Sequence, residues 1–374
     1  RPILLEPLTH DPEPTLEYEA KDGVDNRDPL TMSINTNRGR ALHAAIVYAL
    51  WVQRLLRDVE KVTKPRGLDE IPEVRQVLDY HLDINVEQAL SIRAIYGAKF
   101  PQLFLLDNQW ATENVKLIFS PEGHLQELHD AAWDAYVTYN RAYSNVFDVL
   151  IKEYKVAAER MSDTPSGKSS MVNPEAHLAE HLMVFYWQGK IMIGEPEGIL
   201  QRFFEKAQDD IRGHAIEFVG HNLCNTKETI SINIANRLKE LWETRITAPI
   251  DEEVSLVEIM PFGWWFTSGK FEDSWAIAQL LEVLKIAKKI EPDHRVLERL
   301  ASLSKTFPKE SVQSLGFMVE GDREGWRVRS WREEARTILV NTLQSEEESA
   351  KKAAEDLINR LCAQGYLDYR ELLS

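Results

Sequence analysis

"EAHLAEHLMVFYW", residues 175–187, is the stretch that decides how the rest of the chain is interpreted. It contains His177, Glu180 and His181 in the H-x-x-E-H order of the inverted zinc peptidases. On a helix this spacing places both imidazoles on one face, where they could bind zinc with Glu180 as general base. Glu258 lies downstream at an offset similar to that of the third zinc ligand in those peptidases. The motif therefore indicates either a metallohydrolase or an ordinary helix.

An ordinary helix accounts for more of the surrounding sequence. Asn173 is a suitable N-cap and Pro174 fits the first helical position, so the motif falls in the first two turns. Leu178, Leu182 and Phe185 form the expected buried stripe, with both histidines on its flank. Nothing before the motif has the pattern of the strand-rich half-domain that an inverted peptidase requires. We therefore expect a structural helix in a non-enzymatic chain, without catalytic residues, metal ligands or cofactors, and keep the zinc hydrolase as an alternative.

Helical periodicity continues through almost all of the chain after residue 33. Residues 36–62 have Thr36 as a plausible N-cap, and apolar residues follow at spacings of three and four. Residues 86–107 predict a helix that stops at Gly97 and a second short helix after Pro101. Beyond residue 173 the predicted helices cover residues 174–191, 197–207, 209–223, 226–245, 273–288, 294–304, 308–319, 330–344 and 347–364. No segment sustains the alternation of a strand, so the predicted fold class is all-α.

The helices come in pairs that recur about every 40 residues, which is typical of HEAT- or TPR-like repeats. Such pairs bury their apolar faces by stacking on one another. We predict a helical-repeat solenoid in two lobes, with a compact multi-helix bundle as the alternative. The predicted parts are an irregular lead-in (1–33), an N-terminal helical lobe (34–161), a linker (162–173) and a C-terminal helical-repeat lobe (174–374).

Composition indicates the kind of partner. The net charge of −16 disfavours nucleic acid, because binding to phosphates needs a basic surface. The only cysteines, Cys224 and Cys362, indicate a reduced, cytoplasmic chain without disulfides. The longest apolar run, residues 44–52, is far shorter than the ~20 residues that span a bilayer. We expect a protein partner and no membrane insertion, and the start at Arg1 indicates a fragment or a processed product.

Two segments are candidates for binding that partner. "PFGWWFTSGKFEDSW", residues 261–275, concentrates aromatic side chains, and "DREGWRVRSWREEAR", residues 322–336, is one of the few locally basic stretches. Aromatic and arginine side chains dominate protein-binding hot spots, although packing between repeats would also use the aromatic ones. The candidate partner-binding residues are Trp264, Trp265, Phe266, Lys270, Arg327 and Arg329. Adjacent helical residues point about 100° apart, so we expect one of Trp264 and Trp265 to be buried and the other partly exposed.

Six segments resemble the C-terminal helical region of large bacterial antiviral-defence proteins. They are "DPLTMSINTNRGRALHAAIVYALWV", "IRAIYGAKFPQLFLLD", "EHLMVFYWQGKI", "DIRGHAIEFVGHNL", "FGWWFTSGKFEDSWAI" and "LINRLCAQGYLDYRELL", which fall within residues 28–374. In that family an N-terminal effector is followed by a STAND-type ATPase or a sirtuin-like NADase and then by helical repeats. The shared motifs are packing motifs, so they specify architecture better than activity.

The resemblance implies a sensor domain. It would bind a phage or partner protein and relay activation to effector or ATPase domains of the same parent chain, outside these residues. It also allows a homo-oligomer formed through the parent protein. A structural scaffold solenoid, with no effector attached, is the second alternative.

Overall fold

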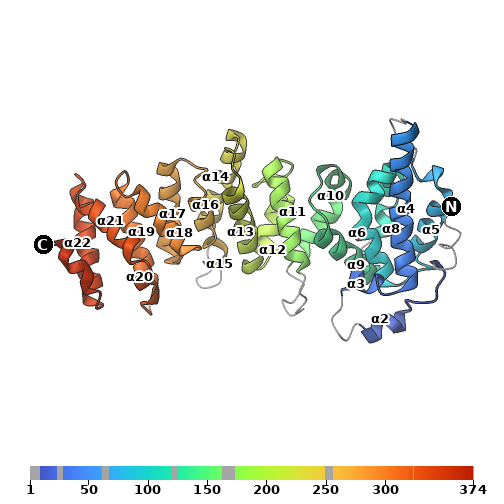
Figure 1. The fold of residues 1–374 in the computed structure, drawn as a ribbon, viewed down its shortest axis with the longest axis horizontal. Helices are drawn as coiled ribbons and strands as arrows, with labels where there is room; N and C mark the ends of the chain where they lie inside the picture. The colour runs from blue at the N-terminus through green and yellow to red at the C-terminus, as the bar shows by residue number, and fades with distance from the viewer. Residues whose placement is uncertain are drawn as a thin grey trace. The chain divides into compact units, whose positions relative to one another are not determined.

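The computed structural model describes residues 9–22, 28–60, 67–119, 125–161, 173–248, 256–322 and 324–373. Within these ranges the chain is helical and contains no strand, which confirms the predicted all-α fold class (Figure 1). None of the helices in the described ranges has the length and apolar character that crossing a membrane requires. Of the predicted linker, 162–173, only Asn173 lies in the described residues.

The chain divides into two compact units. Unit 1 comprises Arg1–Phe185 and Pro196–Lys206, and unit 2 comprises Tyr186–Glu195 and Ala207–Ser374. The division differs from the predicted lobes, because the first part of the helix after Asn173 belongs with unit 1. The reason is packing: Phe185 lies with its ring centroid 4.1 Å from that of Phe147.

Unit 1 is built on a close helix crossing. Its helices are α2 (Leu16–Asp22), α3 (Pro29–Ser33), α4 (Asn37–Glu60), α5 (Pro72–Leu82), α6 (Leu90–Leu106), α7 (Asn108–Glu113), α8 (Val115–Ile118), α9 (Gln126–Tyr139), α10 (Ser144–Glu159), α12 (Ile199–Lys206) and most of α11 (Pro174–Gln188). Small residues line the contact between α6 and α9, including Ala94, Ala98, Ala131 and Ala135. A Cβ atom on Gly97 would lie 1.8 Å from the carbonyl oxygen of Ala132, so only glycine allows this approach.

The prediction that residues 86–107 form two helices was wrong. Helix α6 runs without interruption from Leu90 to Leu106, with Pro101 inside it. Gly97 serves the contact with α9 and does not end the helix. Nearly all residues of α6 before Pro101 are buried, and Leu103 and Leu106 after it are buried too, so packing on both sides of Pro101 supports the helix where a backbone donor is missing.

The predicted irregular lead-in contains helices α2 and α3 and is tied to the rest of unit 1. The Glu19 carboxylate is buried and accepts hydrogen bonds at 2.8 Å from the backbone N–H groups of Leu90 and Ser91, at the start of α6. The Arg38 guanidinium donates to the carbonyl oxygen of Asp11 at 2.9 Å. Long-range polar contacts therefore order a segment that shows little periodicity of its own.

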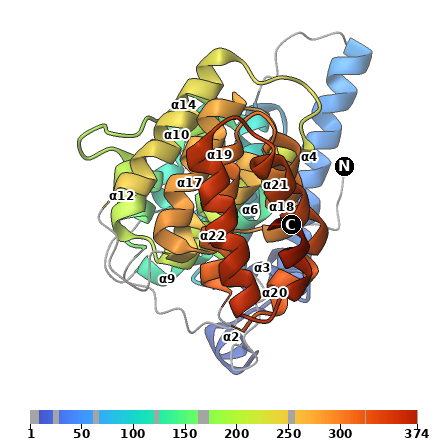
Figure 2. The same cartoon turned by 90° about the vertical axis from the view of Figure 1, so that its left-hand side faces the viewer.

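Unit 2 is a stack of helical hairpins in two layers. The first layer contains α13 (Asp209–Asn225), α15 (Leu256–Ile259), α16 (Phe262–Thr267), α18 (Asp293–Leu303) and α21 (Arg332–Leu343). The second contains α14 (Ile232–Thr247), α17 (Asp273–Ala287), α19 (Pro308–Gly321) and α22 (Glu348–Ala363). The short helix α20 (Trp326–Ser330) connects α19 to α21, and the short helix η4 (Leu367–Leu373) follows α22 and packs against it. In the first layer α13 contacts α15 and α16, α16 contacts α18, and α18 contacts α21. In the second layer α17 contacts α14 and α19, and α19 contacts α22. Figure 2 shows α17, α19 and α22 on one side with α18 and α21 on the other.

The paired sequence pattern predicts stacked hairpins of this kind for the C-terminal lobe, residues 174–374, and unit 2 shows them over residues 207–374. The predicted helices after residue 173 are present with bounds shifted by a few residues. The short helices α15 and α16 were missed, because "LVEIMPFGWWFT" carries Pro261 and Gly263 and no helical period.

Candidate functional site

The two histidines of the H-x-x-E-H motif have different surroundings in unit 1. His177 is partly exposed, with Nδ1 at 3.4 Å from a carboxylate oxygen of Glu180. His181 is buried, and its Nε2 lies 2.8 Å from the carbonyl oxygen of Asn140. A carbonyl oxygen only accepts, so Nε2 carries the proton and donates. The Tyr154 hydroxyl lies 2.7 Å from Nδ1 and therefore donates to it.

These hydrogen bonds engage both ring nitrogens of His181 in the core. The Tyr136 hydroxyl lies 3.1 Å from that of Tyr154 and donates to it, which gives a directed chain from Tyr136 through Tyr154 and His181 to Asn140. Burial lowers the pKa of His181 to about 4, so the ring is neutral near pH 7. No lone pair of His181 is open to a metal ion.

The third residue of the zinc hypothesis, Glu258, is also engaged. It is buried in unit 2, and its two carboxylate oxygens lie 2.5 Å from the Nε atoms of Arg212 and Arg245. These ion pairs join α15 to α13 and α14. The geometry of His181 and Glu258 therefore favours a structural role for the motif.

The aromatic segment separates into a buried and a partly exposed tryptophan, as predicted. Trp265 is fully buried, and its indole N–H donates to the carbonyl oxygen of Ile216 at 2.8 Å. It packs beside Trp242, with ring centroids 5.8 Å apart. Trp264 is partly exposed on α16. The sequence did not determine which of the two would be buried.

Trp264 is held between side chains of the two neighbouring first-layer helices. The His221 ring of α13 meets it edge-on, with centroids 4.4 Å apart. The Arg295 guanidinium of α18 lies 5.2 Å from the centre of its ring, within the range of a cation–π contact. We call His221, Trp264 and Arg295 the Trp264 strip. It crosses three first-layer helices, α13, α16 and α18, and both flanking residues are exposed.

A glycine on α13 makes room for the strip. A Cβ atom on Gly220 would lie 2.5 Å from the Cβ atom of Trp264 and 3.1 Å from the Trp265 ring. The close approach lets Trp265 enter the core while Trp264 stays at the surface. The position of Trp264 is therefore set by the backbones of α13 and α16.

Two other candidates from this segment are less available to a partner. Phe266 is fully buried, so its prediction as a partner-binding residue was wrong. Its ring packs beneath the Arg299 guanidinium, which lies 5.3 Å from the ring centre. Lys270 is partly exposed, and its ammonium donates to the carbonyl oxygen of Glu228 at 2.7 Å. Lys270 thus fixes the turn before α14.

The basic candidates lie around helix α20. Arg327 and Arg329 are exposed, and the Arg327 guanidinium lies 3.5 Å from the Asp293 carboxylate at the start of α18. Trp326 is 70% exposed, whereas Trp331 is buried. A pocket that borders Arg327 and Trp331 has a volume of about 10 Å³, far below the ~300–1,000 Å³ of typical ligand sites.

The structure brings both candidate segments to the first turn of α18. Trp264 contacts Arg295 there, and Arg327 contacts Asp293. Arg295 was not predicted as a site residue, because its contact with Trp264 is a tertiary contact that no local sequence pattern reveals. The sequence "PDHRVLERL" does place Arg295 on the polar side of a strongly amphipathic helix, which is the only available signal.

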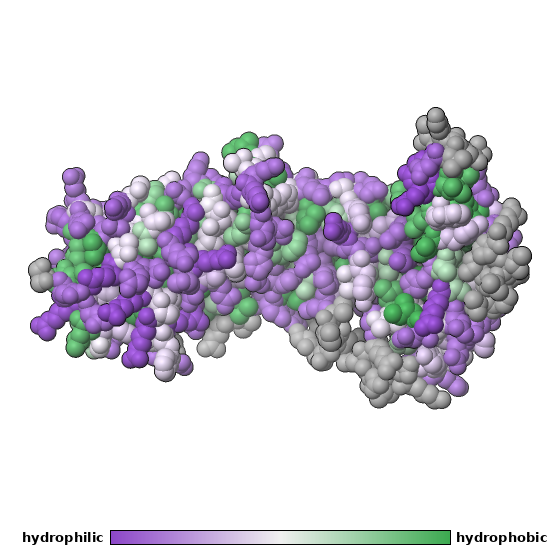
Figure 3. All heavy atoms as spheres, in the orientation of Figure 1, coloured by the Kyte–Doolittle hydropathy of each residue, from purple (hydrophilic) through white to green (hydrophobic). Residues whose placement is uncertain are grey.

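The visible surface around the first-layer helices is predominantly hydrophilic (Figure 3). Exposed apolar residues in unit 2 are scattered, and the largest side chain among them is Trp326. A partner of this surface would therefore be recognised by a few aromatic and charged side chains. Comparisons with protein-family models, curated proteins and solved structures find no match to this chain.

Proposed function

We propose that the chain is a non-catalytic recognition module of a larger bacterial anti-phage defence protein. It binds a phage or partner protein and relays activation to an effector outside this chain, in the cytoplasm. The observation that carries the proposal is the position of Trp264, held partly exposed between His221 and Arg295 on stacked first-layer helices. The resemblance of residues 28–374 to helical regions of such defence proteins supplies the biological setting.

The Trp264 strip has the properties of a binding hot spot. Trp and Arg are the residues most often responsible for binding free energy. Flanking by His221 and Arg295 restricts the rotation of the Trp264 ring, so little side-chain entropy remains to be lost on binding. Surface charges that are already paired, such as Lys239 with Glu272, contribute less binding free energy to a partner.

The position of the Trp264 strip on three helices offers a way to relay partner binding to the rest of the parent protein. His221, Trp264 and Arg295 come from three hairpins, so a partner seated on them contacts all three at once. A partner that prefers one spacing of these hairpins shifts the population toward that spacing. The remainder of the parent protein responds to the shift, through assembly or through its nucleotide-binding domain.

A phage challenge tests the proposal in its setting. A bacterial host expresses the full-length protein that contains this chain, with either the natural sequence or Trp264→Ala. The natural protein should reduce plating of at least one phage in a panel, and Trp264→Ala should restore plating at an unchanged protein level. Phages that escape protection would carry mutations in the gene for the bound protein.

The matched control is Trp51→Ala. Trp51 is an exposed tryptophan on α4 of unit 1, 57% exposed, so the same substitution removes a similar side chain far away in sequence. Protection should persist in this variant. A full-length protein that never protects would refute the defence assignment, and protection that survives Trp264→Ala would refute the role of the strip and favour a structural scaffold.

A further inference from the structure

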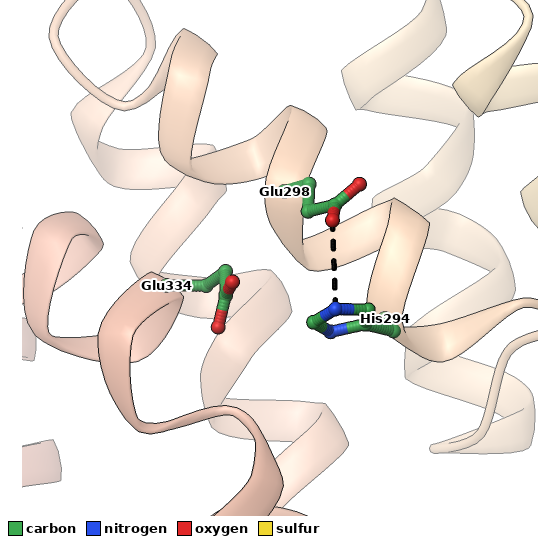
Figure 4. A group of neighbouring side chains, drawn as sticks. All are labelled: His294, Glu298 and Glu334. Atoms are coloured by element: carbon green, nitrogen blue, oxygen red, sulfur yellow. Dashed lines mark ion pairs between the residues drawn. The ribbon is translucent and has the colours of Figure 1, made fainter.

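A second group of polar side chains shares helix α18 with the Trp264 strip, and its His294 is the sequence neighbour of Arg295. His294 and Glu298 occupy consecutive turns of α18, and Glu334 lies on α21 of the next hairpin. One potential ligand atom from each residue lies within 4.8 Å of the other two. Figure 4 shows the three side chains directed into the space between the two helices. Among the described residues this is the one such group of histidine, cysteine and acidic side chains.

The local charges favour a cation in this space. The Glu298 carboxylate lies 3.4 Å from Nε2 of His294. Glu334 forms no ion pair with any lysine or arginine in the described ranges. The two arginines of α18 contact other residues and do not pair with Glu298 or Glu334. Arg295 lies over Trp264, and the Arg299 guanidinium lies 2.6 Å from the Asp273 carboxylate. Apart from His294, no basic side chain of the described residues pairs with both carboxylates, so a bound cation would offset their repulsion.

The ligand types select a class of metal. One imidazole nitrogen and two carboxylate oxygens suit zinc and similar transition metals, whereas calcium and magnesium favour all-oxygen sites. Bond lengths of ~2.0–2.2 Å in a tetrahedral site imply ligand atoms about 3.4 Å apart. Side chains that are exposed or partly exposed can close from 4.8 Å to that separation by small rotations. Two carboxylates also match the charge of a divalent ion.

We infer that His294, Glu298 and Glu334 form a surface site for a divalent transition metal of the zinc class, with water as the fourth ligand. The bound ion joins α18 to α21 and so connects two consecutive hairpins of unit 2. The inference does not depend on the proposed recognition function. It does place a metal beside Arg295, where it would hold one edge of the Trp264 strip.

Titration of the purified full chain with zinc chloride, in buffer free of phosphate and chelators, tests the site. We expect one ion per chain with a Kd of ~1–100 µM and binding of magnesium at least about tenfold weaker. His294→Ala and Glu334→Gln should each weaken zinc binding at least about tenfold, since loss of a direct ligand exceeds the usual outer-shell effect. Zinc should raise the melting temperature of the natural chain and leave that of His294→Ala unchanged.

Glu217→Gln is the matched control. Glu217 and His221 form the same i,i+4 pair on α13, with 3.7 Å between a carboxylate oxygen and Nε2, but no third ligand joins them. Zinc affinity should not change in this variant. Equal affinity in Glu334→Gln and the natural chain would refute the connection between α18 and α21. Binding no tighter than millimolar, or lost equally in Glu217→Gln, would refute the site altogether. Circular dichroism checks that each variant is folded.

Discussion

Helices α11 and α18 both carry histidine and glutamate at helical spacing, yet they use these residues in opposite ways. On α11, His181 is buried and both ring nitrogens have partners in the core of unit 1. On α18, His294 and Glu298 are exposed and face a carboxylate from the next hairpin. Spacing identifies residues that can converge, whereas burial and hydrogen bonding decide whether they are available to a ligand. The motif with the more familiar pattern is therefore the less available one.

The contrast between buried and exposed positions is sharpest at two adjacent residues. Trp265→Ala should lower the free energy of unfolding by ~3–5 kcal/mol, because it empties a fully buried aromatic site and removes the indole hydrogen bond to the carbonyl oxygen of Ile216. Trp264→Ala should cost about 1 kcal/mol or less, since it removes mainly a surface cation–π contact. Chemical denaturation of both variants measures the difference. Equal losses would show that Trp264 is a core residue and would exclude it as a partner-binding residue.

The two histidines of the H-x-x-E-H motif provide the next test. His181→Ala should destabilise unit 1 by about 3 kcal/mol, because it creates a cavity in the core and removes the hydrogen bonds to Tyr154 and to the carbonyl oxygen of Asn140. His177→Ala should change the free energy of unfolding by less than about 0.5 kcal/mol, as is usual at partly exposed positions. Denaturation in the presence and absence of zinc measures both effects. A zinc-dependent stability that either substitution abolishes would restore the metallohydrolase hypothesis.

Acid should destabilise the folded chain through His181. Its pKa in the folded state is about 4, against an ordinary value of 6.5, because burial disfavours the charged ring. Between these two values the unfolded chain binds a proton that the folded chain does not, so stability is complete above pH 6.5 and falls as the pH approaches 4. The loss from this residue should be about 2.5 kcal/mol at pH 4.5.

His181→Gln isolates that contribution, since glutamine keeps a donor and an acceptor but does not titrate in this range. Denaturation at several pH values between 4 and 7 should show a weaker pH dependence in His181→Gln than in the natural chain. His177→Gln is the control and should keep the natural slope. The remaining slope in His181→Gln should include His43, whose pKa burial also lowers to about 4. Identical slopes in the natural chain and His181→Gln would mean that the His181 ring is accessible to water.

Sequence periodicity predicted the helices best where local signals agree. Helix α19 has Pro308 at its first position and a regular apolar stripe, and its predicted and observed starts coincide. The predicted helix boundaries were wrong where the role of a residue depends on a contact with a part of the chain that is distant in sequence. Gly97 looked like a helix stop, but its missing side chain serves the contact of α6 with α9. The lead-in looked irregular because Glu19, which fixes it, acts on residues far along the chain.

The exposure of the candidate partner-binding residues was predictable only in part, because it too depends on contacts between distant parts of the chain. The angle between adjacent helical residues predicted that one of Trp264 and Trp265 would be exposed. The choice between them depends on Gly220, which lies on another helix. Phe266 was assigned to the surface because its segment has no clear period, and Arg295 was missed because Trp264 reaches it only through stacking of hairpins. Glu334 of α21 likewise lies near His294 of α18 only because these two helices pack together.

The most direct test of the central claim is the affinity of the purified chain for the phage protein that escape mutations identify. Isothermal titration calorimetry compares the natural chain with Trp264→Ala and Trp51→Ala, which remove partly exposed tryptophans from unit 2 and unit 1. We predict that Trp264→Ala weakens binding by ~2 kcal/mol or more and that Trp51→Ala leaves it unchanged. Unchanged binding in Trp264→Ala, with or without a loss in Trp51→Ala, would contradict the assignment of recognition to the Trp264 strip.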